Sequence, residues 1–189
     1  MGNADTTREK LLAAAREAMW RRGYANVGLR EIARAAGVDV ALISRYFGGK
    51  QGLFEATLEG AFDLEGLFDD TGSDSVEVIA RAISAPVPAS GVAPPDPLRL
   101  LIMNAADPEV GPTLRARFEA GFLSRLRATL DGPEAKARAA LFTGALLGAV
   151  LARKSLALPG MADADPDEIL RQNRYILAAA LAYPQGGHC

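Results

Sequence analysis

The sequence predicts an all-α protein, in which an N-terminal helix-turn-helix module is followed by a larger helical bundle. Apolar residues recur every three or four positions along most of the chain, and the alternation typical of strands is nearly absent. Gly and Pro interrupt this pattern at places that suit helix ends. The 189 residues, 49% of them hydrophobic, suffice for one or two domains with a core. We therefore expect a division into residues 1–50 and residues 51–189.

The first predicted helix begins at Thr6 and ends before Gly23. Glu9 follows Thr6 by three residues, which is the spacing of a capping box. Gly23 suits the left-handed position that stops a helix. An apolar stripe runs along the helix and is formed by Leu11, Leu12, Ala15, Ala18 and Met19.

Two short helices are predicted next, joined by a tight turn at Ala36-Gly37-Val38. Asp39 follows the turn, where its carboxylate can accept a hydrogen bond from the first turn of the second helix. Ile32 and Phe47 fall on the apolar faces and are expected in the core between the helices. Two helices joined around a glycine form a helix-turn-helix, whose second helix enters the major groove of DNA.

The second helix of this motif and its flanks carry side chains suited to DNA. Small residues permit a close approach, while arginine and tyrosine reach bases or phosphates. Arg45 can donate two hydrogen bonds to guanine, with a phosphate contact as the alternative. Lys50 begins the next helix, where its ammonium and free backbone amides suit a phosphate. The predicted DNA contacts are Arg30, Val40, Ala41, Ser44, Arg45, Tyr46 and Lys50.

Charge is divided unevenly along the chain. Residues 1–50 hold nine basic and five acidic residues, a net charge of +4. The remainder holds twelve basic and eighteen acidic residues, a net charge of −6. A basic module on an acidic body is expected when only one part approaches a polyanion.

The rest of the chain is also predicted to be helical. Gly48-Gly49 separates the motif from the helices that follow. Prolines within residues 85–97 forbid a continuous helix and predict a long loop. Asp165 and Pro166 form a cap and a first-turn proline for the last helix. The predicted helices cover about residues 50–64, 75–84, 97–104, 112–130, 133–156 and 165–183.

Residue types needed for catalysis are scarce. The only histidine, His188, and the only cysteine, Cys189, lie together in a Gly-rich tail, so neither a catalytic triad nor a four-ligand metal site can be assembled in a folded core. We expect no enzyme activity, cofactor or metal. The longest apolar stretch, Leu141–Leu151, is too short for a membrane span, and the N-terminus is unlike a signal peptide, so we expect a cytoplasmic protein.

Several of these residues, taken in order, resemble the DNA-binding domain of the TetR family of bacterial transcription regulators. The resemblance covers about Thr6 to Leu53 and departs from the family pattern at two positions. Gly28 replaces the usual capping Thr or Ser, and Ser44 replaces the usual phosphate-contacting tyrosine. The matching segments are Leu11-Leu12-Ala13-Ala14, Gly23-Tyr24, Ile32 to Val38, Ile43, Tyr46-Phe47, Lys50 and Leu53.

The resemblance implies a homodimer that binds a pseudo-palindromic operator in double-stranded DNA and releases it when a small molecule binds. The implied dimer contacts come from the last two long helices and are Leu141, Gly144, Leu147, Gly148, Leu151, Ile169, Ile176, Leu177 and Ala180. Burial of both helices within one subunit is the alternative. The candidate ligand-binding residues are Phe62, Phe68, Met103, Asn104, Phe118 and Phe122. A DNA-binding regulator without an inducer, and a helical protein-interaction module, remain alternatives.

Overall fold

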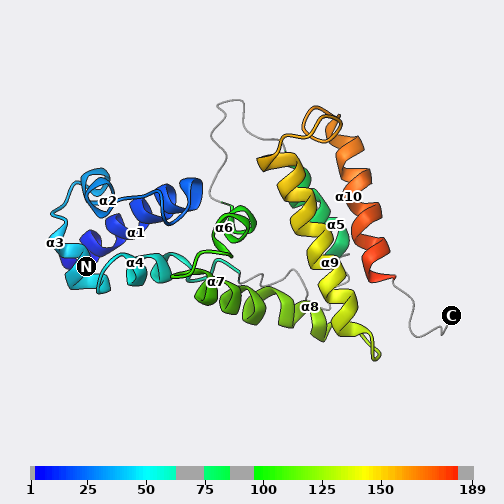
Figure 1. Cartoon of the computed structure of the whole chain (residues 1–189), viewed down its shortest axis with the longest axis horizontal. Coiled ribbons are helices and arrows are strands. Elements are labelled where there is room, and N and C mark those ends of the chain that lie inside the picture. The colour runs from blue at the N-terminus through cyan, green and yellow to red at the C-terminus, as the bar shows by residue number, and fades with distance from the viewer. Residues whose placement is uncertain (1–2, 63–74, 86–95, 183–189) are drawn as a thin grey trace. The chain divides into compact units, whose positions relative to one another are not determined.

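The computed structural model describes residues 3–62, 75–85 and 96–182, and every regular element in these ranges is a helix (Figure 1). The all-α prediction is confirmed. The chain divides into two compact units, one made of Met1–Phe62 and Pro94–Arg117, the other of Asp63–Ala93 and Phe118–Cys189. Residues 96–117 therefore belong with the N-terminal part, which differs from the single division predicted after residue 50.

The first unit is built around its N-terminal helix. This helix packs against α2, α4 and α6, and its predicted stripe is buried at Leu11, Ala15 and Met19. It begins at Asn3, three residues earlier than predicted. The helices of this unit are α1 (Asn3–Arg22), α2 (Leu29–Ala36), α3 (Ala41–Phe47), α4 (Lys50–Thr57), α6 (Pro97–Asn104) and α7 (Gly111–Phe118), whose last residue belongs to the second unit.

Polar side chains of α1 hold the end of α4. The indole Nε1 of Trp20 donates to Oγ1 of Thr57 at 3.0 Å, and both residues are buried. The guanidinium of Arg16 donates to the backbone oxygens of Thr57 and Glu59. Because the last carbonyls of a helix lack partners within it, this arginine satisfies the last carbonyl of α4 and one in the turn that follows. The position of α4 in the unit is thus fixed by both packing and hydrogen bonds.

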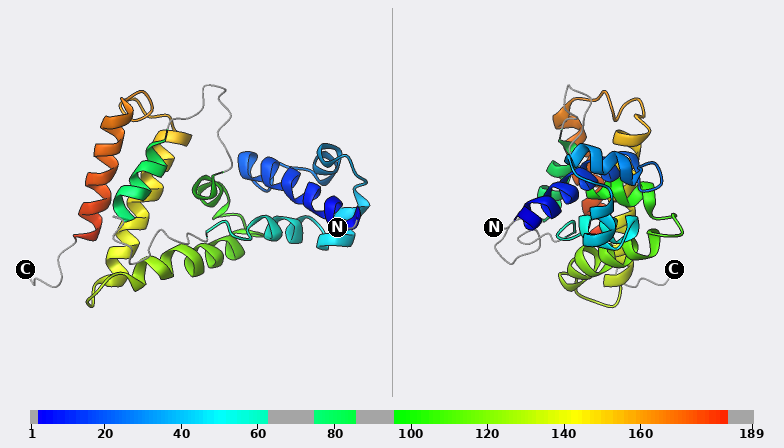
Figure 2. Two further views of the ribbon diagram at one scale, coloured as in Figure 1. Left: turned by 180° about the vertical axis from the view of Figure 1, so that it is seen from behind. Right: turned by 90° about the vertical axis from the view of Figure 1, so that its left-hand side faces the viewer.

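The second unit places α10 beside both α9 and α5, as Figure 2 shows from behind. Its core is formed by Ile79, Ile83, Phe142, Leu146, Ile169 and Leu177. The predicted start of the last helix is confirmed, since Pro166 is its first residue and the side chain of Asp165 accepts from the amide of Asp167. The α-helices of this unit are α5 (Ser75–Ser84), α8 (Ser124–Ala128), α9 (Ala135–Val150) and α10 (Pro166–Leu181).

Two π-helical turns interrupt the longer helices. The first, η1 (Glu119–Leu123), joins α7 to α8, and the second, η2 (Leu151–Ser155), extends α9. Arg153 in η2 donates to the backbone oxygens of Ile83 and Ala85 at the end of α5, and burial lowers the pKa of its guanidinium. The sequence pattern predicted these segments as ordinary helix, because π-helical turns are rare insertions within α-helices.

The combined α9–η2 helix, Ala135–Ser155, is longer than the apolar stretch Leu141–Leu151 considered from the sequence. Over Ala135–Ser155 it is long and apolar enough to cross a membrane, judged by length and composition alone. Only 22% of its most apolar window is buried within the chain. The core helix of a soluble protein passes the same test of length and composition, but is normally well buried. The described residues therefore leave much of the most apolar part of this helix unburied.

Candidate nucleic-acid interface

The helix-turn-helix forms as the sequence predicts, around a left-handed glycine. Gly37 has φ 68°, which L side chains adopt only with strain, and it ends α2. The amide of Val38 donates back to the oxygen of Ala33 at 3.0 Å, closing the turn. Ile32 of α2 and Ile43 of α3 are fully buried. The two helices are thus locked together by a cap and a shared core.

The start of α3 is held by the predicted acidic cap. Oδ1 of Asp39 accepts from the amide of Ala41 at 2.7 Å, although the formal N-cap of α3 is Val40. The start of α2 is different, because Gly28 has no side chain and makes no side-chain cap. A glycine cap costs only about a few tenths of a kcal/mol compared with a polar one.

Five of the seven predicted DNA contacts are exposed on the solvent side of the motif. Arg30 is exposed near the start of α2, and the exposed residues in and just before α3 are Val40, Ala41, Ser44 and Arg45. Tyr46 and Lys50 are half-buried. Small side chains at the start of α3 leave room for a base edge, and Arg45 extends from the same helix. This face has the shape and donors of a major-groove reader.

The region around Phe47 includes a cation that the sequence analysis did not single out. Phe47 is half-buried, and its ring meets that of Tyr46 edge-on, with centroids 6.4 Å apart. The guanidinium carbon of Arg8 lies 5.3 Å from the Phe47 ring centroid. Arg8 therefore adds a positive charge from α1 beside the end of α3. Its position early in α1 gave no signal for this contact.

A glycine inside α4 sets the approach of α3 to α4. A Cβ built on Gly52 would lie 1.9 Å from the backbone oxygen of Phe47, closer than any real contact allows. Only glycine permits α4 to cross the end of α3 at this distance. Sequence reasoning missed Gly52, whose one available signal was a glycine within a predicted helix.

Lys50 is turned toward a buried tyrosine. Its Nζ lies 4.3 Å from the ring centroid of Tyr24, a residue that is 3% exposed. The hydroxyl of Tyr24 donates to Oε1 of Glu109 at 2.6 Å, and burial together with this carboxylate raises the pKa of Tyr24. The backbone amide of Tyr24 donates to Oδ1 of Asn104 at 2.8 Å. A connected set of contacts thus joins the first residue of α4 to α6 and the turn after it.

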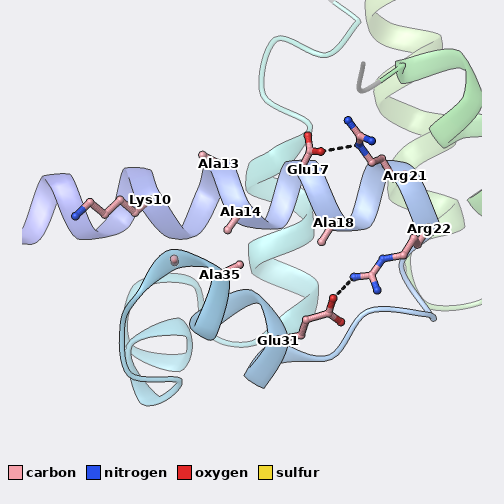
Figure 3. A pocket seen from close by; sticks show the side chains of 10 residues that line it. Lys10, Ala13, Ala14, Glu17, Ala18, Arg21, Arg22, Glu31 and Ala35 are labelled. Atoms are coloured by element: carbon pink, nitrogen blue, oxygen red, sulfur yellow. Dashed lines mark hydrogen bonds and ion pairs between the residues drawn. The ribbon is translucent and has the colours of Figure 1, made fainter. Parts of the chain in front are cut away.

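A surface hollow on the same unit lies between α1 and α2, with alanines of both helices along it (Figure 3). Its rim carries charges of both signs, and four of these side chains form two ion pairs. Arg21 pairs with Glu17, and Arg22 with Glu31. Paired charges do not make a basic surface, and none of the predicted DNA contacts lines the hollow. We do not assign it to DNA.

The candidate ligand residues are placed in several environments. Phe62, Phe118 and Phe122 are buried, and the last two stack with ring centroids 5.2 Å apart. Met103 is exposed. Asn104 is buried, with its amide nitrogen donating to the oxygen of Leu100 while its Oδ1 accepts from Tyr24. Phe68 lies outside the described residues. The pocket these six residues were predicted to form stays a prediction.

The candidate dimer contacts divide by exposure. Leu141, Gly144, Gly148 and Ile176 are exposed, and Leu147, Leu151 and Ala180 are half-buried. Ile169 and Leu177 were expected at the interface but are buried within the second unit. They lie on the side of α10 that packs into the protomer, so their placement does not support a direct contact with a second copy.

Comparison with known families matches most of the chain. Residues 11–57 match the model described as bacterial regulatory proteins of the tetR family. Residues 77–181 match the model described as the tetracyclin repressor-like C-terminal domain.

Two curated relatives share the N-terminal part. The HTH-type transcriptional regulators BetI 2 of Chromohalobacter salexigens and BetI of Ectopseudomonas mendocina are each 43% identical over 58 residues. The matched region is 31% of this chain and 28% and 30% of the two relatives, so it spans less than a third of their lengths.

Solved structures are similar over nearly the whole chain. A transcriptional regulator from Rhodococcus sp. Rha1 has a TM-score of 0.66 at 22% identity, covering 96% of this chain and 99% of its own. A tetR-family regulator from Streptomyces coelicolor has a TM-score of 0.63 at 22% identity, covering 97% and 85%. The SmeT–triclosan complex has a TM-score of 0.66 at 18% identity, covering 93% and 90%. At these identities the likeness is one of fold.

Proposed function

Because the chain belongs to the TetR family of bacterial regulatory proteins, whose members are transcriptional regulators and not enzymes, we propose that it is a homodimeric repressor. Two copies hold a pseudo-palindromic operator in double-stranded DNA, and a small molecule releases them. A protein that acts on bacterial DNA works in the cytoplasm.

The observation that carries the proposal is the exposed face of α3. Val40, Ala41, Ser44 and Arg45 are open to solvent, while Ile43 on the opposite face is fully buried. A helix that is anchored on one side and presents small residues with an arginine on the other suits the major groove. In this proposal Arg45 reads guanine, and Arg30, Tyr46 and Lys50 hold the phosphates.

Selection of bound sequences from random duplex DNA tests this reading. We expect an inverted repeat, because a two-fold dimer places two identical heads on two half-sites. Binding should weaken steeply with added salt through counterion release. Failure to enrich any sequence at low salt would contradict specific DNA recognition and favour the alternative of a protein-interaction module.

Two variants separate base reading from phosphate binding. Arg45→Ala should cost about 1–3 kcal/mol on the preferred site and relax preference at one position. Lys50→Ala should weaken all sequences to a similar extent and lower the salt slope by about one unit. A uniform loss with both variants would reduce Arg45 to a phosphate contact.

Dimerisation through α9 and α10 is supported by the apolar surface that the protomer leaves open. Leu141 is 46% exposed and Ile176 is 41% exposed. Gly144 and Gly148 of α9 are also exposed, and a Cβ at either would meet no atom within 4 Å. Small residues at this spacing permit close helix packing. A second copy of these two helices is the partner we propose for the apolar α9–η2 helix.

Gly148→Leu tests the interface at an exposed position of the protomer, where an added Cβ meets no atom within 4 Å. We expect the unaltered protein to be a dimer at micromolar concentration by light scattering, and the variant to dissociate while keeping its helical content. Ala128→Leu adds the same side chain at an exposed position of α8 and should remain dimeric. A monomeric unaltered protein would contradict the dimer, and recovery in membranes would assign the apolar helix to a bilayer.

Release by a small molecule is supported by the family and by the fold shared with SmeT, which was solved with triclosan. Ligand binding would favour a conformation in which the two heads no longer match the operator spacing. A screen of metabolites against the protein bound to its selected DNA tests this. We expect one compound class to release the DNA while light scattering still reports a dimer. Release by dissociation into monomers would contradict the mechanism, and no release would favour a regulator without an inducer.

A further inference from the structure

We propose that the ring of Tyr24 is an autoinhibitory partner of Lys50, that it competes with the operator phosphate, and that Glu109 strengthens this competition. The inference rests on the proposed DNA-binding function and deepens it. It assigns to Tyr24 and Glu109 a part in setting operator affinity, although neither lies on the face of α3 that meets DNA.

The first step is the direction of the lysine. Its Nζ lies 4.3 Å from the centroid of the Tyr24 ring, within the range of a cation–π interaction. Tyr24 is 3% exposed, so an ammonium held against its face points into the unit. A phosphate bound at the start of α4 would have to draw the ammonium away from the ring. Lys50 therefore has two partners, and it cannot hold both at full strength.

The second step is the strength of the inner contact. The Tyr24 hydroxyl donates to Oε1 of Glu109 at 2.6 Å, a short bond to a charged acceptor. Donation to a carboxylate leaves more negative charge on the ring, whose face then attracts an ammonium more strongly. The carboxylate charge acts in the same direction through space. Glu109 thus favours the position of Lys50 in which its ammonium lies against the Tyr24 ring.

The third step is that Tyr24 is held in place. Its amide is bonded to Oδ1 of Asn104, and its ring meets Phe54 edge-on, with centroids 5.2 Å apart. The ring cannot follow the lysine outward, so the contact is lost when Lys50 turns to DNA. Breaking it reduces the net gain from the phosphate contact.

Glu109→Gln is the sharpest test, because glutamine keeps an oxygen that accepts from the Tyr24 hydroxyl and removes only the charge. We expect the full-length variant to bind its selected duplex about two- to threefold more tightly, a fraction of a whole cation–π contact, because the substitution weakens the contact without removing it. The same substitution in a Lys50→Gln background should change affinity less than about 1.5-fold. Fluorescence anisotropy with labelled duplex measures all four proteins at one salt concentration.

The comparison of Glu109→Gln with and without Lys50→Gln also controls for a general charge effect. Removing any carboxylate makes the protein less negative and attracts DNA by long-range electrostatics. That gain would persist without Lys50, whereas release of Lys50 cannot. An equal gain in both backgrounds, no gain, or a loss would overturn the competition.

A second measurement needs no DNA. The chain has four lysines, Lys10, Lys50, Lys136 and Lys154, so their labelled ε-methylene groups give a simple NMR spectrum. Protons over an aromatic face resonate upfield. We expect one upfield signal in the free protein, absent in Lys50→Gln, reduced in Glu109→Gln, and moved downfield when the duplex is added.

These outcomes distinguish a failure of the Lys50–Tyr24 competition from a failure of the proposed DNA-binding function. Absence of the upfield signal would overturn the inner contact even if DNA binds well. Persistence of the signal in the DNA complex would overturn the competition. No binding of any duplex by the unaltered protein would overturn the proposed function, and this inference with it.

Discussion

Asn104→Leu should destabilise the first unit, because it removes the hydrogen bonds of a buried asparagine. Asn104 is 2% exposed, and its Oδ1 accepts the backbone amide of Tyr24, which lies 80 residues away in sequence. Leucine fills a similar volume but cannot accept this hydrogen bond. The Tyr24 amide would then be buried without a partner, which costs about 1–3 kcal/mol.

A second loss and a gain adjust this magnitude. The side-chain amide of Asn104 also donates to the oxygen of Leu100, and losing that bond costs about 1 kcal/mol. The leucine side chain returns about 1–2 kcal/mol through apolar burial. With the middle of each range, the net expectation is a loss of about 1.5 kcal/mol in the free energy of unfolding. For a chain of this size, the melting temperature should fall by about 3–6 °C.

Urea unfolding at one protein concentration measures the global effect, and amide hydrogen exchange at Tyr24 measures the local one. Asn26→Ala is the matched control. The Asn26 side chain also donates to a backbone oxygen, that of Arg22, but this bond is exposed and its loss should cost less than about 0.5 kcal/mol. An unchanged midpoint with full protection of the Tyr24 amide would refute the reasoning.

Three further substitutions test the turn, the α3–α4 contact and the buried tyrosine. Gly52→Ala should lower the free energy of unfolding by more than about 2 kcal/mol, since its Cβ would lie 1.9 Å from the Phe47 oxygen; an unchanged urea midpoint would contradict the close approach. Asp39→Ala should cost about 1 kcal/mol by removing the acceptor for the Ala41 amide, and equal losses for Asp39→Ala and Asp39→Asn would argue against capping. Burial raises the pKa of Tyr24, so at pH values above about 10 the folded protein keeps the phenol proton that the unfolded chain loses. The free energy of unfolding should therefore fall as the pH rises through that range. Tyr24→Phe should flatten this alkaline decline, and identical slopes for the two proteins would rule out the assignment.

Local features of the fold were predictable from the sequence because their causes are local. Gly37 ends α2 through its own backbone conformation, and Asp165 with Pro166 starts α10 within one turn. The same holds for α6, predicted and found at Pro97–Asn104. Neighbouring residues decide these boundaries, so a single sequence is enough to read them.

The contacts around Lys50 and Tyr24 were not predictable, because they join distant parts of the chain. Glu109 lies 85 residues from Tyr24, and no periodicity links them. Ile169 and Leu177 share the apolar character of the exposed Ile176, so only the fold distinguishes the protomer core from open surface. Sequence pattern identifies which residues can act, and packing decides which of them face DNA, a second copy or the interior.

The single tryptophan of the chain gives this protein a built-in optical reporter. Trp20 is buried with its indole donating to Thr57, the last residue of α4, and its ring lies under the guanidinium of Arg16. Indole emission depends on hydrogen bonding, nearby charge and access of water. A shift of α4 against α1 would therefore change the colour or intensity of the native fluorescence. Titrations with operator DNA and with candidate effectors can therefore be followed on the unlabelled protein. The rate of the fluorescence change would report how fast the contact between α1 and the end of α4 responds to binding.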